Sequence, residues 1–261
     1  MNPQEELKKL HEGWSNCNRC VLGKRREEFK LKQVYGTGAL RGVMFISSSP
    51  NGDNEQTGSP VSGDDMLLLR GAVSKYKLDK YAYYTTISSC RSAEVATTKT
   101  GRPRTYTDKA GKVHVVWEDK PLATPTVLEC KPRILQEIYL VDPLVIVTLG
   151  PQAANILLKN RSALSFIRGS VENLVVDGRS LIPVLTEKKK EWIRSYKGKE
   201  WKVVSSPRPV RYLCVPTYHP EYVMSTIQNE SSGDGSKEFL DFISDIKLVA
   251  DILAKYEEVI S

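Results

Sequence analysis

Short apolar runs alternate with segments of helical pattern along most of this chain. The runs are rich in aliphatic and aromatic residues and lead into polar or glycine-containing sequence, which is typical of buried strands. They lie at 42–49, 81–89, 143–150 and 211–217. Other segments have apolar residues near helical spacing, acids in a first turn or a proline at a first helical position. These predicted helices lie at 64–76, 124–142, 151–160 and 237–257.

This alternation of strands and helices predicts an α/β fold. Strands that alternate with helices form a mainly parallel sheet covered on both faces. We therefore expect a three-layer α/β/α architecture around a central, mainly parallel four-stranded sheet. At 261 residues, the chain is expected to form a single domain, residues 1–261. Two segments break the pattern, at about 97–123 and 187–211, and we expect insertions at the edge of the sheet there.

Charge and composition say little about what the protein binds. The chain has 38 Lys and Arg against 31 Asp and Glu, and this net charge of +7 suits a polyanion without requiring one. It has no run of about eighteen apolar residues, so no transmembrane helix is expected. The start, MNPQEELKKL, lacks the apolar segment of a secretory signal. We expect a cytoplasmic monomer without a membrane partner.

The candidate chemistry follows the predicted strands. Ligands of open α/β sheets bind at the carboxyl ends of the strands. Here those ends run into SSSPNGDNEQTGSPVSGDD, SSCRSAE, LGPQA and PTYHPEY. His219, one of only three histidines, follows the fourth strand directly. Five cysteines also need a role, because structural disulfides are rare in a reducing compartment.

The order of the motifs resembles a known family. The chain has C-x2-C at 17–20, G-x-P at 58–60, C-R at 90–91, V-x-L-G at 147–150 and P-T-Y-H-P at 216–220. In this order they resemble the iron–sulfur uracil-DNA glycosylases, the family-4 branch of the uracil-DNA glycosylase superfamily. The resemblance spans roughly residues 10–250 apart from the two insertions. It implies a uracil-DNA glycosylase-like fold and a DNA glycosylase that acts on DNA.

The resemblance also implies a cofactor. In that family four cysteines hold a [4Fe–4S] cluster, and thiolates are the usual ligands of such a cluster. Carried over by position, they are Cys17, Cys20, Cys90 and Cys130. Four thiolates also suit zinc, which stays the competing chemical interpretation. Cys214 has no counterpart and is expected to be a core thiol.

The active site keeps one family residue and changes others. His219 matches the histidine that is expected to hydrogen-bond the base carbonyl and stabilise the leaving anion. The first motif, G-E-A-P-G in uracil-excising members, is Ser47, Ser48, Ser49, Pro50 and Asn51 here, which puts Ser48 at the glutamate position. The stacking phenylalanine of the family falls on Val61, and its base-reading asparagine falls on Thr86. Each change shortens a side chain, which favours a roomier pocket for a bulky polar pyrimidine.

Three functions stay open at this point. The first is a monofunctional glycosylase that flips out and hydrolytically removes a modified pyrimidine, such as hydroxymethylated or glucosylated cytosine of phage DNA, in antiviral defence. The second is uracil excision in base excision repair, and the third is an iron–sulfur DNA-binding protein without turnover. Since the glutamate position holds Ser48, another carboxylate must assist catalysis. We favour Asp53, with Glu55 second.

Contacts with DNA are expected at three places. Arg168, in the R-G pair of the family, is expected near the phosphate backbone. The basic and aromatic segment 188–211 fits phosphate neutralisation and contacts with unpaired bases. Its first cations are Lys188, Lys189 and Lys190. Tyr222 or Met224 is the candidate side chain that wedges into the duplex.

Overall fold

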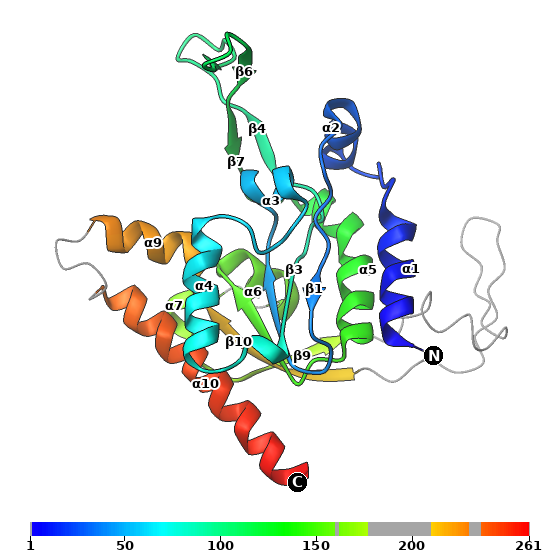
Figure 1. The fold of residues 1–261 in the computed structure, drawn as a ribbon, viewed down its shortest axis with the longest axis vertical. Coiled ribbons are helices and arrows are strands. Elements are labelled where there is room, and N and C mark those ends of the chain that lie inside the picture. The colour runs from blue at the N-terminus through cyan, green and yellow to red at the C-terminus, as the bar shows by residue number, and fades with distance from the viewer. Residues whose placement is uncertain (1, 160–161, 177–209, 230–235, 261) are drawn as a thin grey trace, which may run out of the picture.

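The centre of the protein is a six-stranded sheet in the order β1-β3-β2-β8-β10-β9 (Figure 1). The computed structural model describes residues 2–159, 162–176, 210–229 and 236–260. The middle four strands are parallel: β3 (Ala82–Thr86), β2 (Val43–Ser47), β8 (Val145–Leu149) and β10 (Val210–Thr217). Two antiparallel edge strands that the sequence pattern did not predict flank them: β1 (Thr37–Gly38) and β9 (Glu172–Val176). The expected mainly parallel sheet is confirmed.

Helices cover both faces of this sheet, as the three-layer prediction requires. Successive side chains of a strand point to opposite faces. Met44 and Ile46 of β2 enter the core on one face, whereas Val43 and Phe45 enter the core on the other face. Burial on both faces explains why the strands are uninterrupted apolar runs. The first face has α1 (Pro3–Trp14), α5 (Thr124–Val141) and α6 (Pro151–Leu158); the second has α4 (Asp64–Lys75) and α10 (Lys237–Ile260).

A projecting arm interrupts the alternation between β3 and α5. Its outer part is a hairpin in which β5 (Thr105–Thr107) pairs antiparallel with β6 (Val113–Val115), so a hairpin does form within 97–123. At its base β4 (Ala93–Val95) pairs antiparallel with β7 (Trp117–Asp119). Figure 1 shows this arm, defined here as residues 93–120, extending beyond α3 (Gly52–Thr57) at one end of the molecule.

The remaining described elements are short connectors and flanking helices. They are α2 (Val21–Phe29), the 3-10 turn η1 (Asp79–Tyr81), α7 (Leu164–Ile167) and α9 (Pro220–Asn229). Within the described part of the chain, no helix is both long and apolar enough to span a membrane. Of the second expected insertion, 187–211, only residues 210 and 211 lie within the described residues, where they begin β10.

Candidate active site

A cavity of about 260 Å³ opens at the carboxyl ends of the parallel strands, where the sheet topology predicts a ligand. Its walls come from the segment after β2, the start of α4, the turn between β8 and α6, the base of the arm and the residue after β10. Ser47, Ser48, Ser49, Pro50 and Asn51 all line it, and so does His219. The structure therefore brings the first motif and the histidine motif to one pocket.

His219 is held in the pocket by the backbone on both sides of it. It follows Thr217 and Tyr218 at the end of β10, and α9 begins at Pro220. Gly150, at the end of β8, has a φ of +86°, and a Cβ atom there would lie 3.1 Å from Cβ of His219. A side chain at residue 150 would therefore be both strained and in the way of the imidazole.

The hydrogen bonding of His219 determines which ring nitrogen carries the proton that it can donate to a ligand. The backbone N–H of Glu221 donates to Nδ1 over 3.3 Å. Burial lowers the pKa of His219, and the carboxylates of Asp65 and Glu221 oppose this shift only in part. The imidazole is therefore neutral near pH 7, with Nδ1 as acceptor and its proton on Nε2. The side chain is 26% exposed, so it can meet a ligand in the cavity.

Asp65 is one of two carboxylates that influence this histidine; the other, Glu221, has its Oε2 3.9 Å from Nδ1 of His219. Asp65 lies in the first turn of α4, lines the pocket, and accepts a hydrogen bond of 3.4 Å from Nδ2 of Asn51. Burial raises the pKa of Asp65, while the electrostatic influence of His219 acts in the opposite direction. Sequence reasoning noted Asp65 only as one acid among several at the start of this helix. No local signal marks the side chain, because its direction depends on how α4 packs.

The loop that contains Asn51 is held by side-chain hydrogen bonds. Asn51 and Asn54 form a reciprocal capping box at the start of α3: each side chain bonds the backbone of the other. Nδ2 of Asn54 also donates to the carbonyl oxygen of Ser62 over 2.9 Å, which ties α3 to the segment before α4. Both asparagines line the pocket, so their amides are polar groups that a base in the cavity can meet.

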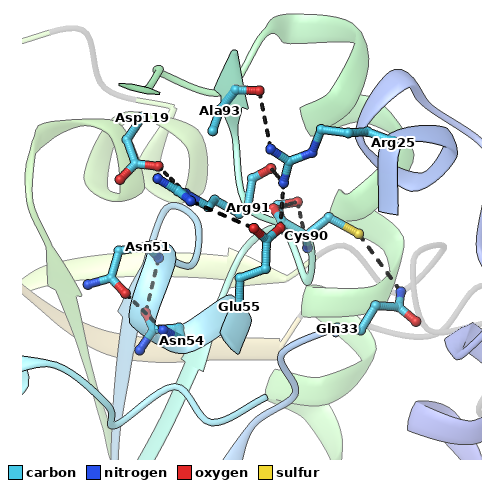
Figure 2. Close-up of polar contacts among 10 residues, drawn as sticks. Arg25, Gln33, Asn51, Asn54, Glu55, Cys90, Arg91, Ala93 and Asp119 are labelled. Carbon is cyan, nitrogen blue, oxygen red and sulfur yellow. Dashed lines mark hydrogen bonds and ion pairs between the residues drawn. The ribbon is translucent and has the colours of Figure 1, made fainter. Parts of the chain in front are cut away.

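The two carboxylates favoured from the sequence lie elsewhere. Figure 2 shows Glu55 between Arg25 and Arg91; it is buried, it forms a close ion pair with Arg25, and Arg91 lies 3.7 Å away. Asp53 is exposed, and its Oδ2 would lie 2.9 Å from a Cβ atom at Gly63. Neither residue is among the described residues that line the pocket.

Two other positions taken from the family are also outside the lining. Thr86 is buried, and its hydroxyl donates to the carbonyl oxygen of Ser88 over 2.7 Å. Val61 is partly buried against the core beneath α4. The aromatic surface of the pocket comes instead from Phe45 and Tyr84, whose rings stack with their centroids 5.3 Å apart.

The base of the arm forms one wall of the cavity. Asp119, Lys120 and Pro121 all line it. The next residue, Leu122, is held by the amide of Gln152 on α6, which accepts from the Leu122 N–H over 3.0 Å and donates to its carbonyl over 3.1 Å. Sequence reasoning predicted only an insertion at the edge of the sheet here, because strand pairing across 93–119 cannot be seen in a pattern of single positions.

The predicted DNA contacts have mixed positions. Arg168 is engaged within the protein: it bonds Asp245 at 2.7 Å and Asp241 at 3.2 Å. Tyr222 and Met224 lie on α9, and Tyr222 is 48% exposed. The predicted lysines lie outside the described residues, and they are Lys188, Lys189 and Lys190.

Comparison with known proteins agrees with this architecture. The family model of the uracil DNA glycosylase superfamily matches residues 35–247. The chain belongs to the uracil DNA glycosylase superfamily. A type-4 uracil-DNA glycosylase of Pyrobaculum aerophilum is 26% identical over 176 residues, which cover 67% of this chain and 76% of that protein. The resemblance to family-4-like members is thus confirmed, and so is the enzyme class, a DNA glycosylase.

Membership of this superfamily raises the question of the four cysteines. Cys130 of α5 hydrogen-bonds Cys20 at the start of α2, which lowers the pKa of Cys20 to about 5. Burial raises the pKa of Cys90 to about 11, and the nearby Cys20 and Cys17 thiols add to the rise. Cys214 is distinct, because it lies buried within β10, where burial raises its pKa to about 12.

The donor chemistry at this place fits an iron–sulfur cluster. Four thiols from three separate segments interact with one another there. In the described part of the chain, no three His, Cys, Asp or Glu side chains are grouped closely enough to hold a metal ion. The four irons of a cluster are spread more widely than a single ion, and each takes its own thiolate. Occupancy by a cluster stays a prediction.

Proposed function

We propose that this DNA glycosylase removes a modified pyrimidine that is bulkier than uracil. The observation that carries the proposal is the lining of the cavity by Ser47, Ser48 and Ser49, with Ser48 at the position of the family glutamate. At about 30 Å³ per water, 260 Å³ corresponds to roughly nine water molecules. That leaves room beyond a bare pyrimidine ring for a polar substituent, which hydroxyl and amide groups can hydrogen-bond.

The residues of the pocket suit hydrolysis of the bond between the base and C1′ of the sugar. As this bond breaks, its electron pair moves onto the base, and the sugar becomes cationic. The Nε2–H of His219 donates to the base carbonyl, where the negative charge collects. The carboxylate of Asp65 faces the cationic side of the reaction and orients the water that attacks C1′. As the water oxygen bonds to C1′, Asp65 accepts the water proton. The base leaves as an anion and takes up a proton from solvent to become a free pyrimidine.

The four cysteines suit a structural role beside this chemistry. A [4Fe–4S] cluster held by Cys17, Cys20, Cys90 and Cys130 would crosslink the start of α2, the segment after β3 and α5. Cys90 precedes Arg91, whose side chain lies 2.5 Å from Asp119 on the wall of the pocket. The cluster would thus stabilise the segment that holds the base of the arm.

Bulky modified pyrimidines occur mainly in phage DNA, so a glycosylase of this kind would serve in antiviral defence. The test is incubation with uracil-containing DNA and, separately, with phage DNA that contains glucosylated hydroxymethylcytosine, followed by alkali to break abasic sites. We expect breaks in the phage DNA only. Breaks confined to uracil DNA would identify a repair enzyme. Binding without breaks in either DNA would identify a protein without turnover.

A further inference from the structure

The arm has features that base excision in the pocket does not use. It extends well beyond the body of the protein, on the side where α3 and the carboxyl ends of the parallel strands lie (Figure 1). Its outer part is a two-stranded antiparallel ribbon, β5 paired with β6. A two-stranded ribbon that projects into solvent buries no hydrophobic core of its own. We therefore look to its exposed side chains for its function.

The arm is held firmly at its base. Nη1 of Arg25 donates to the carbonyl oxygen of Ala93 over 3.4 Å, and its guanidinium lies 4.8 Å from the centre of the Trp117 ring. The backbone N–H of Lys120 donates to the carbonyl oxygen of Ser92 over 2.7 Å. Figure 2 shows Arg25 and Arg91 reaching Ala93 and Asp119, one on each strand of the base. The direction of the ribbon is therefore set relative to the pocket.

The charge of the arm is strongly uneven after its internal pairs are taken into account. Three of its four acids are engaged: Asp108 by His114, Glu118 by Arg104 and Lys120, and Asp119 by Arg91. The fourth, Glu94, lies exposed on β4 at the base of the arm. Its other cations form no ion pair with any residue of the described part of the chain, and all are exposed: Lys99, Arg102, Lys109 and Lys112. The outer arm is therefore a cationic surface, which complements a polyanion.

Exposed apolar and aromatic groups lie among these cations. Tyr106 is 56% exposed and Val113 is 63% exposed. The rings of Tyr106 and His114 stack across the ribbon, with their centroids 5.1 Å apart. Cations interspersed with an aromatic ring are the combination by which proteins contact phosphates and bases together.

We infer that the arm is a second DNA-binding element, which grips the duplex beside the nucleotide in the pocket. A two-stranded β-ribbon fits the major groove of B-form DNA. Lys109 and Lys112 flank the turn at the tip of the ribbon, and Lys120 lies at its base on the pocket wall. The strand that enters the pocket can therefore meet cations along the length of the arm. The inference depends on DNA being the substrate, not on which base is removed.

The experiment compares two variants that lose the same charge. One replaces Arg102, Lys109 and Lys112 with Ala, and the matched control replaces the exposed Lys75, Lys247 and Lys255 on α4 and α10. Binding to a fluorescent duplex without a modified base is followed by anisotropy from about 50 mM to about 200 mM salt. In a plot of log affinity against log salt concentration, each phosphate contact that is removed makes the slope shallower by about 0.9.

We expect the arm variant to bind about tenfold or more weakly at low salt, with a slope reduced by about 2.7 for its three cations, while the control keeps nearly all of its affinity. Thermal unfolding should change little in either variant, because the replaced side chains are exposed and the ion pair that the control loses, Lys247–Asp251, is an exposed pair. Equal losses in the two variants would mean that only net charge matters and would overturn the inference. Unchanged DNA binding, with a concentration-dependent change in mass for Tyr106→Ser, would instead assign the arm to self-association.

Discussion

The backbone N–H of Glu221 donates a hydrogen bond of 3.3 Å to Nδ1 of His219. This bond occupies the lone pair on one ring nitrogen and leaves the proton of the neutral imidazole on the other. Burial lowers the pKa of His219, which keeps the imidazole neutral near pH 7. A neutral donor suits a leaving anion, because it stabilises the charge without transferring a full positive charge into the pocket.

His219→Ala is therefore expected to impair chemistry much more than binding. Loss of one donor to a developing anion typically costs a hundred- to thousand-fold in rate, or about 2.7–4 kcal/mol. Affinity for DNA should change by less than about threefold, since phosphate contacts dominate binding. Single-turnover excision and anisotropy on the same DNA separate the two effects. An equal loss in both would show that His219 only maintains the fold.

Asp65→Asn is expected to lower the rate of excision by about 10²- to 10⁴-fold. The active form has an ionised Asp65, so the rate of the native enzyme should rise with pH through the pKa of this carboxyl. Burial raises that pKa, which moves the acid limb of the pH profile above the usual range of aspartate. The variant should have no such limb. Asp53→Asn and Asp64→Asn, changes at exposed carboxyls nearby, are the matched controls and should keep it.

Stability gives a second readout for Asp65. An acid whose pKa is raised by folding destabilises the folded state at any pH where it is ionised. Asp65→Asn should therefore unfold at the same temperature as the native protein or higher at neutral pH. A large fall in the unfolding temperature would instead mean that the carboxylate serves the fold through Asn51 and Met66.

Ser48→Glu is expected to reduce excision of a bulky modified base by about tenfold or more. Forcing a larger side chain into an occupied site typically costs about 1–3 kcal/mol, and Ser48 lines the cavity. Kinetics on the modified substrate should show the loss mainly in the affinity for the flipped base. Unchanged excision would mean that the base does not reach Ser48, and the argument for a substrate larger than uracil would fail.

The cysteines give a prediction that is independent of substrate. Protein purified anaerobically should be brown and contain about four irons per chain. Cys17→Ser and Cys130→Ser should each lose the colour and most of the iron, whereas Cys214→Ser, a change at a separate buried thiol, should keep both. Iron analysis and visible absorbance measure this. A colourless protein with one zinc per chain would refute the cluster.

Arg133 and Glu137 form a buried ion pair one turn apart on α5. Arg133 also donates to the carbonyl oxygens of Thr86 and Ile87, at the end of β3. Burial raises the pKa of Glu137, but Arg133 and His11 outweigh it and bring the value to about 2. The pair therefore contributes stability above the ordinary pKa range of glutamate, and this contribution is lost as the pH falls toward about 2.

Arg133→Met should accordingly destabilise the protein by about 3–5 kcal/mol at neutral pH, because it removes the guanidinium that stabilises this buried carboxylate. Lys247→Met, which breaks the exposed pair with Asp251 at the same spacing on α10, should cost less than about 1 kcal/mol. Urea unfolding followed by circular dichroism measures both. Similar losses in the two variants would contradict the expected effect of burial.

The sequence by itself determined the four parallel strands of the sheet, the main helices and the superfamily. The run Val145–Leu149 is apolar at every position, because both faces of the sheet are covered, and this pattern is visible without a structure. The motif around His219 was equally readable, since it follows a strand whose end must lie at the ligand edge of the sheet. Such features depend on residues that are close together in the chain, so they can be recognised in the sequence.

Only the tertiary structure decided which acid of the segment after β2 lines the pocket. Asp53, Glu55 and Asp65 lie within one acid-rich segment, and nothing in their spacing distinguishes them. Glu55 forms ion pairs with Arg25 and Arg91, which are distant in sequence. Asp65 lies on α4, whose packing brings its carboxylate within electrostatic reach of His219. The position of Lys120 in the pocket wall likewise depends on a backbone hydrogen bond to Ser92, on the opposite side of the base of the arm. Contacts between distant segments set these directions, and a pattern of single positions does not contain them.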